Sequence, residues 1–273
     1  MKISCLPVSL FADICDGKSD IIQWASEAKK LGYDAIDISI MFLKNRTPTY
    51  LSKLKKGLAE INMPIAMMTT YPDFTNPDPK QRKREFEYLV SDIALASEIG
   101  ISYLRILAGQ AHPEMGIEEG IGLVVDNFKK IASFGEYYGV GLVFEDHAKP
   151  GAWDHVDFCY PPEIFLRICE GIRGTSIRVN YDTGNITAYG GDAVEVLSKV
   201  IDLVETVHVS DMSEKGRFSP TTIGAGVVPN KEIFHLLKKN GFNGWLCIEE
   251  GSGRGLEGIK IAHSFVKDAS NNA

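Results

Sequence analysis

The stretch GLVFEDHAK, residues 141–149, constrains the arrangement of the whole chain. It opens with a glycine and three apolar residues, which are followed at once by Glu145, Asp146 and His147. A short apolar run bounded by glycine is typical of a strand buried on both faces, as in a parallel sheet. The stretch therefore predicts a buried strand with two carboxylates and an imidazole at one end of the core, where polar groups are costly.

Three later apolar stretches end in polar residues in much the same way. They are VNYDTGN at 179–185, VETVHVSD at 204–211 and WLCIEEG at 245–251. The repeated pattern predicts a barrel that holds a metal ion at one mouth.

Size and composition favour one soluble domain over residues 1–273. An α/β barrel commonly fills about 200–250 residues as one domain, and 44% hydrophobic with 24% charged residues is ordinary for a globular protein. No run approaches the roughly 18 apolar residues of a membrane span, so no membrane partner is expected. The five scattered cysteines, odd in number, indicate reduced thiols and a cytoplasmic location.

The net charge of −7, from 29 Lys plus Arg against 36 Asp plus Glu, weighs against a nucleic-acid partner. Proteins that bind a nucleic-acid backbone usually carry a basic surface. We therefore expect a small-molecule partner, and a homo-oligomer stays open.

A unit made of an amphipathic helix, a glycine and a short apolar strand recurs along the chain. Gly32, Gly100, Gly139 and Gly241 each suit the left-handed residue that closes a helix. The predicted strands are residues 3–8, 35–39, 64–69, 103–107, 142–145, 177–182, 204–209 and 245–249. The predicted helices are residues 19–31, 48–62, 78–99, 117–138, 161–171, 192–200, 230–240 and a last one after 255.

This alternation predicts an α/β fold of the (β/α)₈ TIM-barrel type, whose active sites lie at the C-terminal ends of the strands. A doubly wound open sheet would give the same alternation. Closure is favoured because polar residues gather after the fifth to eighth strands, where a barrel would make them converge.

An acidic residue or a histidine ends each of four successive predicted strands. These residues are Glu145, Asp182, His208 and Glu249. Three carboxylates at one point would repel one another, and at least one would be forced neutral. A divalent cation removes this repulsion, and the ligand set suits Mn²⁺ or Mg²⁺, with Zn²⁺ or Co²⁺ as alternatives. The other interpretation is that four unrelated residues cap strands or form ion pairs.

Strand parity selects Glu249 rather than its neighbour Glu250 for this group. Successive side chains in a strand point to opposite faces, so an inward Glu249 also turns Cys247 inward. Leu246 and Ile248 then face the helices. An inward Glu250 would instead drive Glu249 into the apolar layer between strands and helices.

Five pieces of the chain resemble a known family. They are GVGLVFEDH (139–147), VNYDTGN (179–185), VETVHVSDM (204–212), IGAGVVP (223–229) and GFNGWLCIEE (241–250). They resemble the sugar phosphate isomerase/epimerase superfamily, the xylose isomerase-like barrels that include inosose dehydratase, hydroxypyruvate isomerase, ketose 3-epimerases and endonuclease IV. The first hundred residues match only in their alternation of strands and helices.

The resemblance implies a metal-dependent enzyme of carbohydrate metabolism, an isomerase or epimerase of a small sugar, polyol or keto acid. The family's Glu, Asp, His and Glu metal ligands fall on Glu145, Asp182, His208 and Glu249. A metal that holds a carbonyl and the adjacent hydroxyl acts as a Lewis acid, with Glu145 and Glu249 as the acid–base pair that moves a proton on carbon.

Two other reactions stay open. An inosose-type dehydratase uses the same proton abstraction and then expels a hydroxyl. An endonuclease IV-like hydrolase is disfavoured, because it would need more metal-binding His and Glu than a chain with six histidines offers.

Four residues are candidates for substrate binding. Asn185 stands where several ketose epimerases have a substrate-contacting His, and Gly151 replaces their substrate-binding Glu, which weakens the case for a free-ketose 3-epimerase. His147 shares strand parity with Glu145, and His112 follows the fourth strand. Arg217 and Lys215 lie in the loop after the seventh strand, and Lys149 lies in the loop after the fifth. Each could hold a phosphate or carboxylate of the substrate, and a solvated or locally hydrogen-bonded side chain is the plain alternative.

Overall fold

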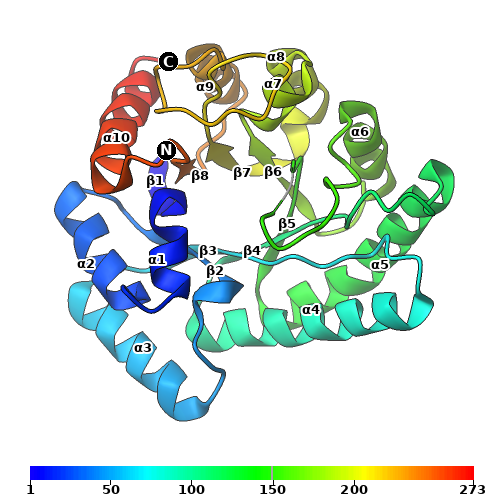
Figure 1. Ribbon diagram of the computed structural model, residues 1–273, viewed down its shortest axis with the longest axis horizontal. Helices are drawn as coiled ribbons and strands as arrows, with labels where there is room; N and C mark the ends of the chain where they lie inside the picture. The colour runs from blue at the N-terminus through cyan, green and yellow to red at the C-terminus, as the bar shows by residue number, and fades with distance from the viewer. Residues whose placement is uncertain (149) are drawn as a thin grey trace.

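Eight parallel strands form one sheet that curls into a nearly closed barrel, with the helices arranged around it (Figure 1). The structure is a computed structural model that describes residues 1–148 and 150–273. The strands are β1 (Lys2–Leu6), β2 (Ile36–Ser39), β3 (Ile65–Thr69), β4 (Tyr103–Ile106), β5 (Gly141–Glu145), β6 (Arg178–Asp182), β7 (Val204–Val209) and β8 (Trp245–Glu249). The predicted (β/α)₈ TIM barrel is confirmed.

Long helices connect the strands, and several short helices lie in the loops. The α-helices are α1 (Phe11–Cys15), α2 (Ile21–Leu31), α3 (Pro48–Ile61), α4 (Pro79–Ile99), α5 (Ile117–Tyr138), α6 (Pro162–Gly171), α7 (Asn185–Tyr189), α8 (Ala193–Val200), α9 (Asn230–Lys239) and α10 (Gly255–Asn271). The 3-10 helices are η1 (Val8–Leu10), η2 (Ile40–Phe42) and η3 (Ile201–Leu203).

All eight predicted strands and all eight predicted helices exist, and no predicted end differs from the observed one by more than two residues. The prediction that the first strand continues to Val8 is wrong, because β1 ends at Leu6 and η1 begins at Val8. The short helices α1 and α7 were not predicted. Each has only five residues, too few for a helical pattern to show in the sequence.

The barrel closes between β1 and β2 without a regular ladder, since the sheet order runs β1-β8-β7-β6-β5-β4-β3-β2. The Asp34 N–H donates to the Ile3 carbonyl at 2.9 Å, and the Ile3 N–H donates to the Asp34 carboxylate at 2.9 Å. One layer up, the Ser4 hydroxyl donates to Asp37 Oδ2 at 2.6 Å. Side chains therefore complete the closure that backbone pairing leaves open.

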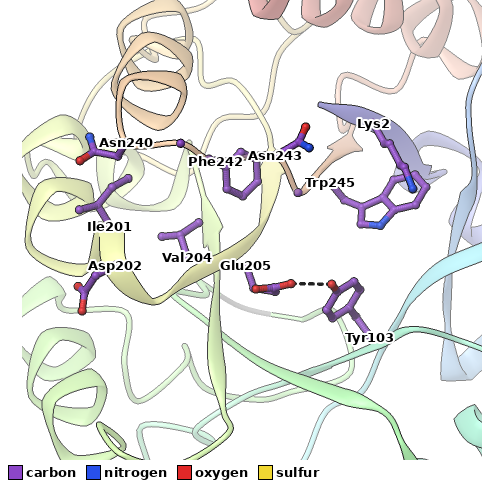
Figure 2. Close-up of a pocket in the computed structure, with 12 residues that line it drawn as sticks. Lys2, Tyr103, Ile201, Asp202, Val204, Glu205, Asn240, Phe242, Asn243 and Trp245 are labelled. Carbon is purple, nitrogen blue, oxygen red and sulfur yellow. Dashed lines mark hydrogen bonds between the residues drawn. The ribbon is translucent and has the colours of Figure 1, made fainter.

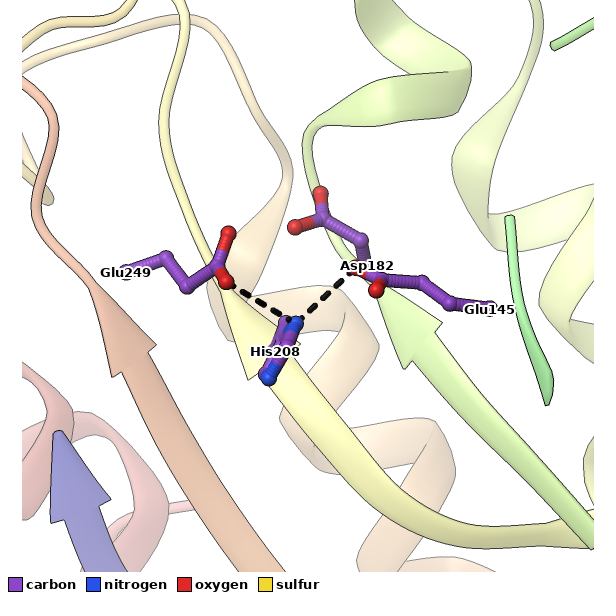
Figure 3. A group of neighbouring side chains, drawn as sticks. All are labelled: Glu145, Asp182, His208 and Glu249. Atoms are coloured by element: carbon purple, nitrogen blue, oxygen red, sulfur yellow. Dashed lines mark hydrogen bonds and ion pairs between the residues drawn. The ribbon is translucent and has the colours of Figure 1, made fainter. Parts of the chain in front are cut away.

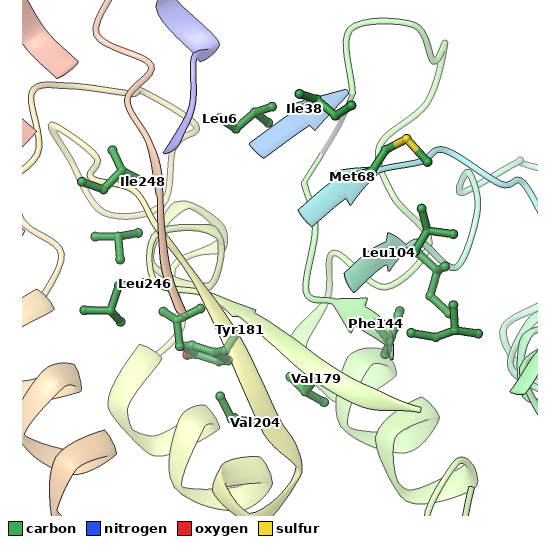
Figure 4. Packing of buried hydrophobic residues seen from close by; sticks show 14 of the residues in the cluster. Leu6, Ile38, Met68, Leu104, Phe144, Val179, Tyr181, Val204, Leu246 and Ile248 are labelled. Atoms are coloured by element: carbon green, nitrogen blue, oxygen red, sulfur yellow. The ribbon is translucent and has the colours of Figure 1, made fainter. Parts of the chain in front are cut away.

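Strand parity separates two buried layers, as expected from the sequence. Outward residues such as Phe144, Tyr181 and Leu246 pack in the large apolar layer between strands and helices (Figure 4). Met67, Val143 and Cys247 form a separate small cluster inside the barrel. Because the barrel interior is narrow, inward side chains from different strands are forced to meet.

Glycines end helices where the sequence predicted them to. Gly32, Gly100 and Gly139 are the left-handed C-caps of α2, α4 and α5, with φ values of 89°, 91° and 66°. Gly241, one residue beyond the Asn240 C-cap of α9, has φ 79°. Each helix thus turns directly into the following strand, which fixes where that strand ends.

Among the described residues, no helix combines the length and apolar character needed to cross a membrane. All five cysteines lie in the described part of the chain and carry free thiols.

Candidate metal centre

Four side chains from neighbouring strands meet at the C-terminal mouth of the barrel (Figure 3). They are Glu145, Asp182, His208 and Glu249, and one ligand atom from each lies within 4.8 Å of the others. Glu145 Oε1 approaches His208 Nδ1 to 2.9 Å, and Glu249 Oε1 approaches the same nitrogen from the opposite side to 3.2 Å. The structure therefore brings together all four residues that the strand ends predicted.

Sheet register produces this convergence. Asp182 at the end of β6 lies opposite His208 on β7, and His208 lies opposite Cys247 on β8, two residues before Glu249. Glu145 on β5 lies opposite Asn180 on β6. Residues two positions apart in a strand face the same side, so the pairing of β5 to β8 places all four side chains on the inner face of the barrel.

The site is buried, and burial controls its carboxyl groups. Burial raises the pKa of Glu145 to about 7, against the lowering effect of Arg105. Burial, together with the charge of Glu145, raises the pKa of Asp182 to about 6. Burial also raises the pKa of Glu249 to about 7, although His208 lowers it. The three carboxyl groups are thus harder to ionise here than in water, because their charged forms would lie buried in one small volume.

The donor set fits a divalent cation. Three carboxylates and one imidazole are ordinary ligands for such ions, and a cation at their centre would offset the cost of burying three negative charges together. Among the described residues, these four are the one group of His, Cys, Asp or Glu with this geometry.

Backbone and hydroxyl donors hold one oxygen of Asp182 in place. Asp182 Oδ1 accepts from the Ser210 hydroxyl at 2.8 Å, the Gly184 N–H at 2.7 Å and the Asn185 N–H at 2.9 Å. Oδ1 is thereby saturated, which leaves Oδ2 as the oxygen for a cation. The Asn185 side chain donates to the Asp146 carbonyl at 2.9 Å, so this sequence candidate also ties the end of β5 to α7.

Arg105 on β4 is a member of the site that the sequence reasoning missed. Its guanidinium is 2% exposed, and Nε lies 2.9 Å from Glu145 Oε2 in an ion pair whose angle is too bent for a hydrogen bond. The same guanidinium lies over the Tyr71 ring, 5.0 Å from its centroid. Arg105 therefore binds the Glu145 oxygen that faces away from His208.

We expect Arg105→Met to destabilise the metal-free protein by about 3–5 kcal/mol, because it leaves the Glu145 carboxylate buried without its counter-charge. Added Mn²⁺ should recover part of this loss by supplying a positive charge beside Glu145. Urea unfolding with EDTA and with Mn²⁺ measures both effects. The matched control is Arg46→Met, which breaks the more exposed Arg46–Asp92 pair outside the barrel and should show no recovery specific to Mn²⁺. Equal losses for the two variants under both conditions would contradict this role of Arg105.

A small cavity opens beside the four ligands. Its volume is about 70 Å³, and His147, Asp182, Asn185 and Glu249 contribute to its lining. The Glu249 side chain is 20% exposed, whereas those of Glu145 and His208 are fully buried. Glu249 is therefore the carboxylate of the pair that a bound molecule can reach from this cavity.

A larger cavity of about 470 Å³ lies at the opposite, N-terminal end of the barrel (Figure 2). Tyr103 donates to Glu205 at 2.6 Å there, and the Lys2 ammonium lies over the Trp245 ring. Tyr103 and Trp245 begin strands whose other ends carry the site. This cavity is larger than the one beside the four side chains, but it lies at the other end of the barrel from the carboxylates and the histidine.

His147 contributes to the site as a neutral ring. Its Nδ1 lies 3.8 Å from Asp157 Oδ2, beyond hydrogen-bond distance. Burial lowers the pKa of His147 well below its usual range, and the positive charge of Arg105 lowers it further. The ring also lines the small cavity, so it is placed to contact a bound molecule.

The structure does not bring the other sequence candidates to the four ligands. His112 Nε2 pairs with Asp73 Oδ2 at 2.8 Å, in a network that joins the loops after β3 and β4. The Arg217 side chain is 75% exposed and pairs with Glu214 at 3.0 Å. Neither is part of the cavity lining. Lys149 lies outside the described residues.

The sequence profile of the family described as the xylose isomerase-like TIM barrel matches residues 25–269. This range contains the four ligands and most of the barrel.

Curated relatives cover most of the chain at low identity. The chain is 23% identical over 258 residues to an inosose dehydratase of Geobacillus thermodenitrificans, which covers 85% of this chain and 83% of the relative. It is also 23% identical over 248 residues to a protein of Haemophilus influenzae provisionally named L-ribulose-5-phosphate 3-epimerase. The match covers 82% of this chain and 81% of the relative.

Solved structures share the fold over its full length. The IolI protein, whose crystal structure holds a zinc atom, superposes with a TM-score of 0.82 at 18% identity and covers 100% of this chain and 99% of its own. A D-tagatose 3-epimerase-like protein superposes with a TM-score of 0.79 at 17% identity, over 100% of this chain and 99% of its own.

Proposed function

Because the chain belongs to the xylose isomerase-like TIM barrel family, we propose that it is a divalent-metal-dependent isomerase or epimerase of a small sugar, polyol or keto acid. The observation that carries this proposal is the four-residue ligand group at the barrel mouth, with Glu249 open to a cavity. Relatives named as an inosose dehydratase and a sugar-phosphate epimerase support the same substrate class.

Glu145, Asp182, His208 and Glu249 would hold the cation. When bound, a divalent cation supplies a Lewis acid that polarises a carbonyl oxygen and makes the neighbouring C–H more acidic. Mn²⁺ or Mg²⁺ suits a set of three carboxylates and one imidazole, and Zn²⁺ or Co²⁺ is the alternative.

The two glutamates are not equivalent in this proposal. Glu145 is buried and paired with Arg105, whereas Glu249 reaches the cavity where a substrate carbon would lie. We assign Glu249 as the base that removes the proton from carbon, and Glu145 as the partner that returns one from the other side of His208. A carboxyl group with a pKa near 7 is well matched to proton transfer at neutral pH.

An inosose-type dehydratase is the second candidate, and the name of the Geobacillus relative favours it. It would use the same base and cation, but a hydroxyl on the next carbon would leave after proton removal. A hydrolase of the endonuclease IV type has less support, because no further ligand group of the required geometry occurs among the described residues.

A D₂O experiment separates these reactions. The Mn²⁺-loaded protein is incubated with ketoses, inososes and hydroxy-keto acids in D₂O and followed by NMR. We expect deuterium to enter one C–H bond of a substrate, together with an isomer or epimer. Loss of water from an inosose would identify the dehydratase, whereas cleavage of abasic DNA with no change in any sugar would refute both.

A further inference from the structure

The loop between β7 and α9 contains a small hairpin that borders the cavity beside the site. Met212 and Pro220 form an antiparallel bridge at its base, and the Ser213 N–H donates to the Ser219 carbonyl at 2.8 Å. We call residues 212–220 the strap. Its own backbone pairing gives it a defined shape although it lies in a long loop.

The strap is attached at both ends to segments that carry site residues. At its tip, the Gly216 N–H donates to the Thr187 carbonyl of α7 at 3.0 Å, and α7 begins at Asn185 beside the Asp182 ligand. At its base, Pro220 packs on Gly251, where an added Cβ would lie 3.1 Å from Pro220 Cβ. Gly251 is two residues after Glu249, so the strap runs from the Glu249 side to the Asp182 side.

Phe218 lies between these two attachments and lines the small cavity. Its ring is 52% exposed, so core packing does not account for an aromatic residue at this position. Met212, Pro220 and Val8 extend the apolar side of the cavity, and Asp182 and Glu249 form part of its polar side. A molecule in the cavity would therefore meet ligating oxygens on one face and an aromatic ring on another.

The charges in the cavity lining are acidic. Asp182, Asp211 and Glu249 belong to it, whereas no lysine or arginine does so in the described part of the chain. The Asp211 carboxylate is already occupied by the backbone N–H groups of Gly224, Gly226 and Val228. The carboxylates of Asp182 and Glu249 therefore remain as acceptors for the hydroxyl groups of a bound molecule.

The volume of the cavity limits what it can enclose. Its roughly 70 Å³ compares with about 30 Å³ for a water molecule in the liquid. It can therefore enclose the reacting carbons of a sugar but not a whole five- or six-carbon molecule. The remainder of such a substrate would pass outward along the exposed ring of Phe218.

From this arrangement we propose that Phe218 is a substrate-contacting residue that packs on the C–H face of a sugar or polyol held in the cavity. The inference rests on the proposed function for the position of the substrate. Aromatic rings offer a large apolar surface to such a face at little conformational cost. The strap holds the ring over the cavity by its attachments to α7 and Gly251.

The test uses L-ribulose and D-fructose as probes on the Mn²⁺-loaded full chain. Affinity is measured by titration calorimetry, and deuterium exchange by NMR. The variants are Phe218→Ala and Phe218→Trp, and the matched control is Ser213→Ala, which changes an exposed strap residue outside the lining. Circular dichroism verifies that each variant is folded.

We expect Phe218→Ala to weaken binding of a free sugar about tenfold while the rate at saturation changes little. Phe218→Trp should restore binding, and Ser213→Ala should bind like the parent. Unchanged affinity in Phe218→Ala, or no binding of any probe, would overturn the inference. If a free sugar bound through Phe218 but exchanged no deuterium, the proposed function would be wrong and this inference would stand. If deuterium exchange and affinity did not depend on Phe218, this inference would be wrong and the proposed function would stand.

Discussion

Glu249→Gln should remove deuterium exchange from the substrate almost completely while leaving the barrel folded. The amide keeps the shape of the side chain but cannot accept the proton from carbon. A positioned general base contributes about 10²–10⁴-fold to a rate, so we expect a loss of that size in the rate at saturation. NMR exchange in D₂O with saturating Mn²⁺ measures it, since saturation compensates for any loss of metal affinity.

The neighbouring glutamate provides the control for this variant. Glu250 is also buried, but it points away from the barrel interior: its Oε2 accepts from the Ser9 hydroxyl at 2.6 Å and its Oε1 from the Ser252 N–H at 3.0 Å. Glu250→Gln should therefore lower stability and retain exchange. If Glu249→Gln kept full exchange, or if Glu250→Gln abolished it in a folded protein, Glu249 would not be the base.

Glu145→Gln should behave differently from Glu249→Gln, although we propose both residues as ligands. Its loss leaves the buried Arg105 guanidinium without a counter-ion, so stability should fall together with activity. This contrast follows from the ion pair with Arg105 and could not be predicted from the two strand ends alone.

The convergence of the four residues could be predicted from the sequence because each position depends on local rules that act together. An apolar run defines a strand, parity defines its inner face, and the polar residue at its end defines the mouth. For β8 these rules distinguished Glu249 from Glu250, two adjacent residues of the same type. No contact between distant segments had to be known.

Arg105 follows the same rules, and its signal was present in the sequence. It lies between Leu104 and Ile106 in a buried strand, where both neighbours face the helices. An arginine on the inner face of such a strand must find a carboxylate, because an unpaired buried charge is very costly. Attention to strand ends alone missed it, since Arg105 lies one residue before its strand ends.

The strap and the short helix α7 could not be predicted in this way. Their positions depend on hydrogen bonds between loops far apart in the chain, such as that from Gly216 to Thr187. Loop sequences such as SEKGRFSP indicate turns but not the segment on which those turns rest. The Phe218 position is therefore information that only the structure supplies.

Metal removal should have the second large effect, and its size should depend on pH. Chelation with EDTA is expected to abolish exchange and to lower the melting temperature. At a metal concentration 100-fold above its dissociation constant, binding stabilises a fold by about 2.7 kcal/mol, which corresponds to roughly 5–10 °C for a chain of this size. Scanning fluorimetry with EDTA and with excess Mn²⁺ measures the difference.

The direction of the pH dependence follows from the raised pKa values. In the metal-free protein the pKa is about 7 for Glu145 and Glu249 and about 6 for Asp182, against about 4 for such groups in an unfolded chain. The folded state therefore binds more protons between about pH 4 and pH 7. The stability that protonation confers is fully present below about pH 4 and is lost as the pH rises through 6 to 7.

A cation must displace those protons, so its stabilising effect should grow over the same range. We expect the rise in melting temperature on adding Mn²⁺ to be small at pH 5.5 and largest near pH 7.5. Asp182→Asn should lose most of the rise at every pH, because it removes one of three charged ligands while its Oδ1 partners keep the loop in place. A rise that is equal at all pH values, or that persists in Asp182→Asn, would mean that the ion binds elsewhere, and the mechanism proposed for Glu249 would lose its Lewis acid.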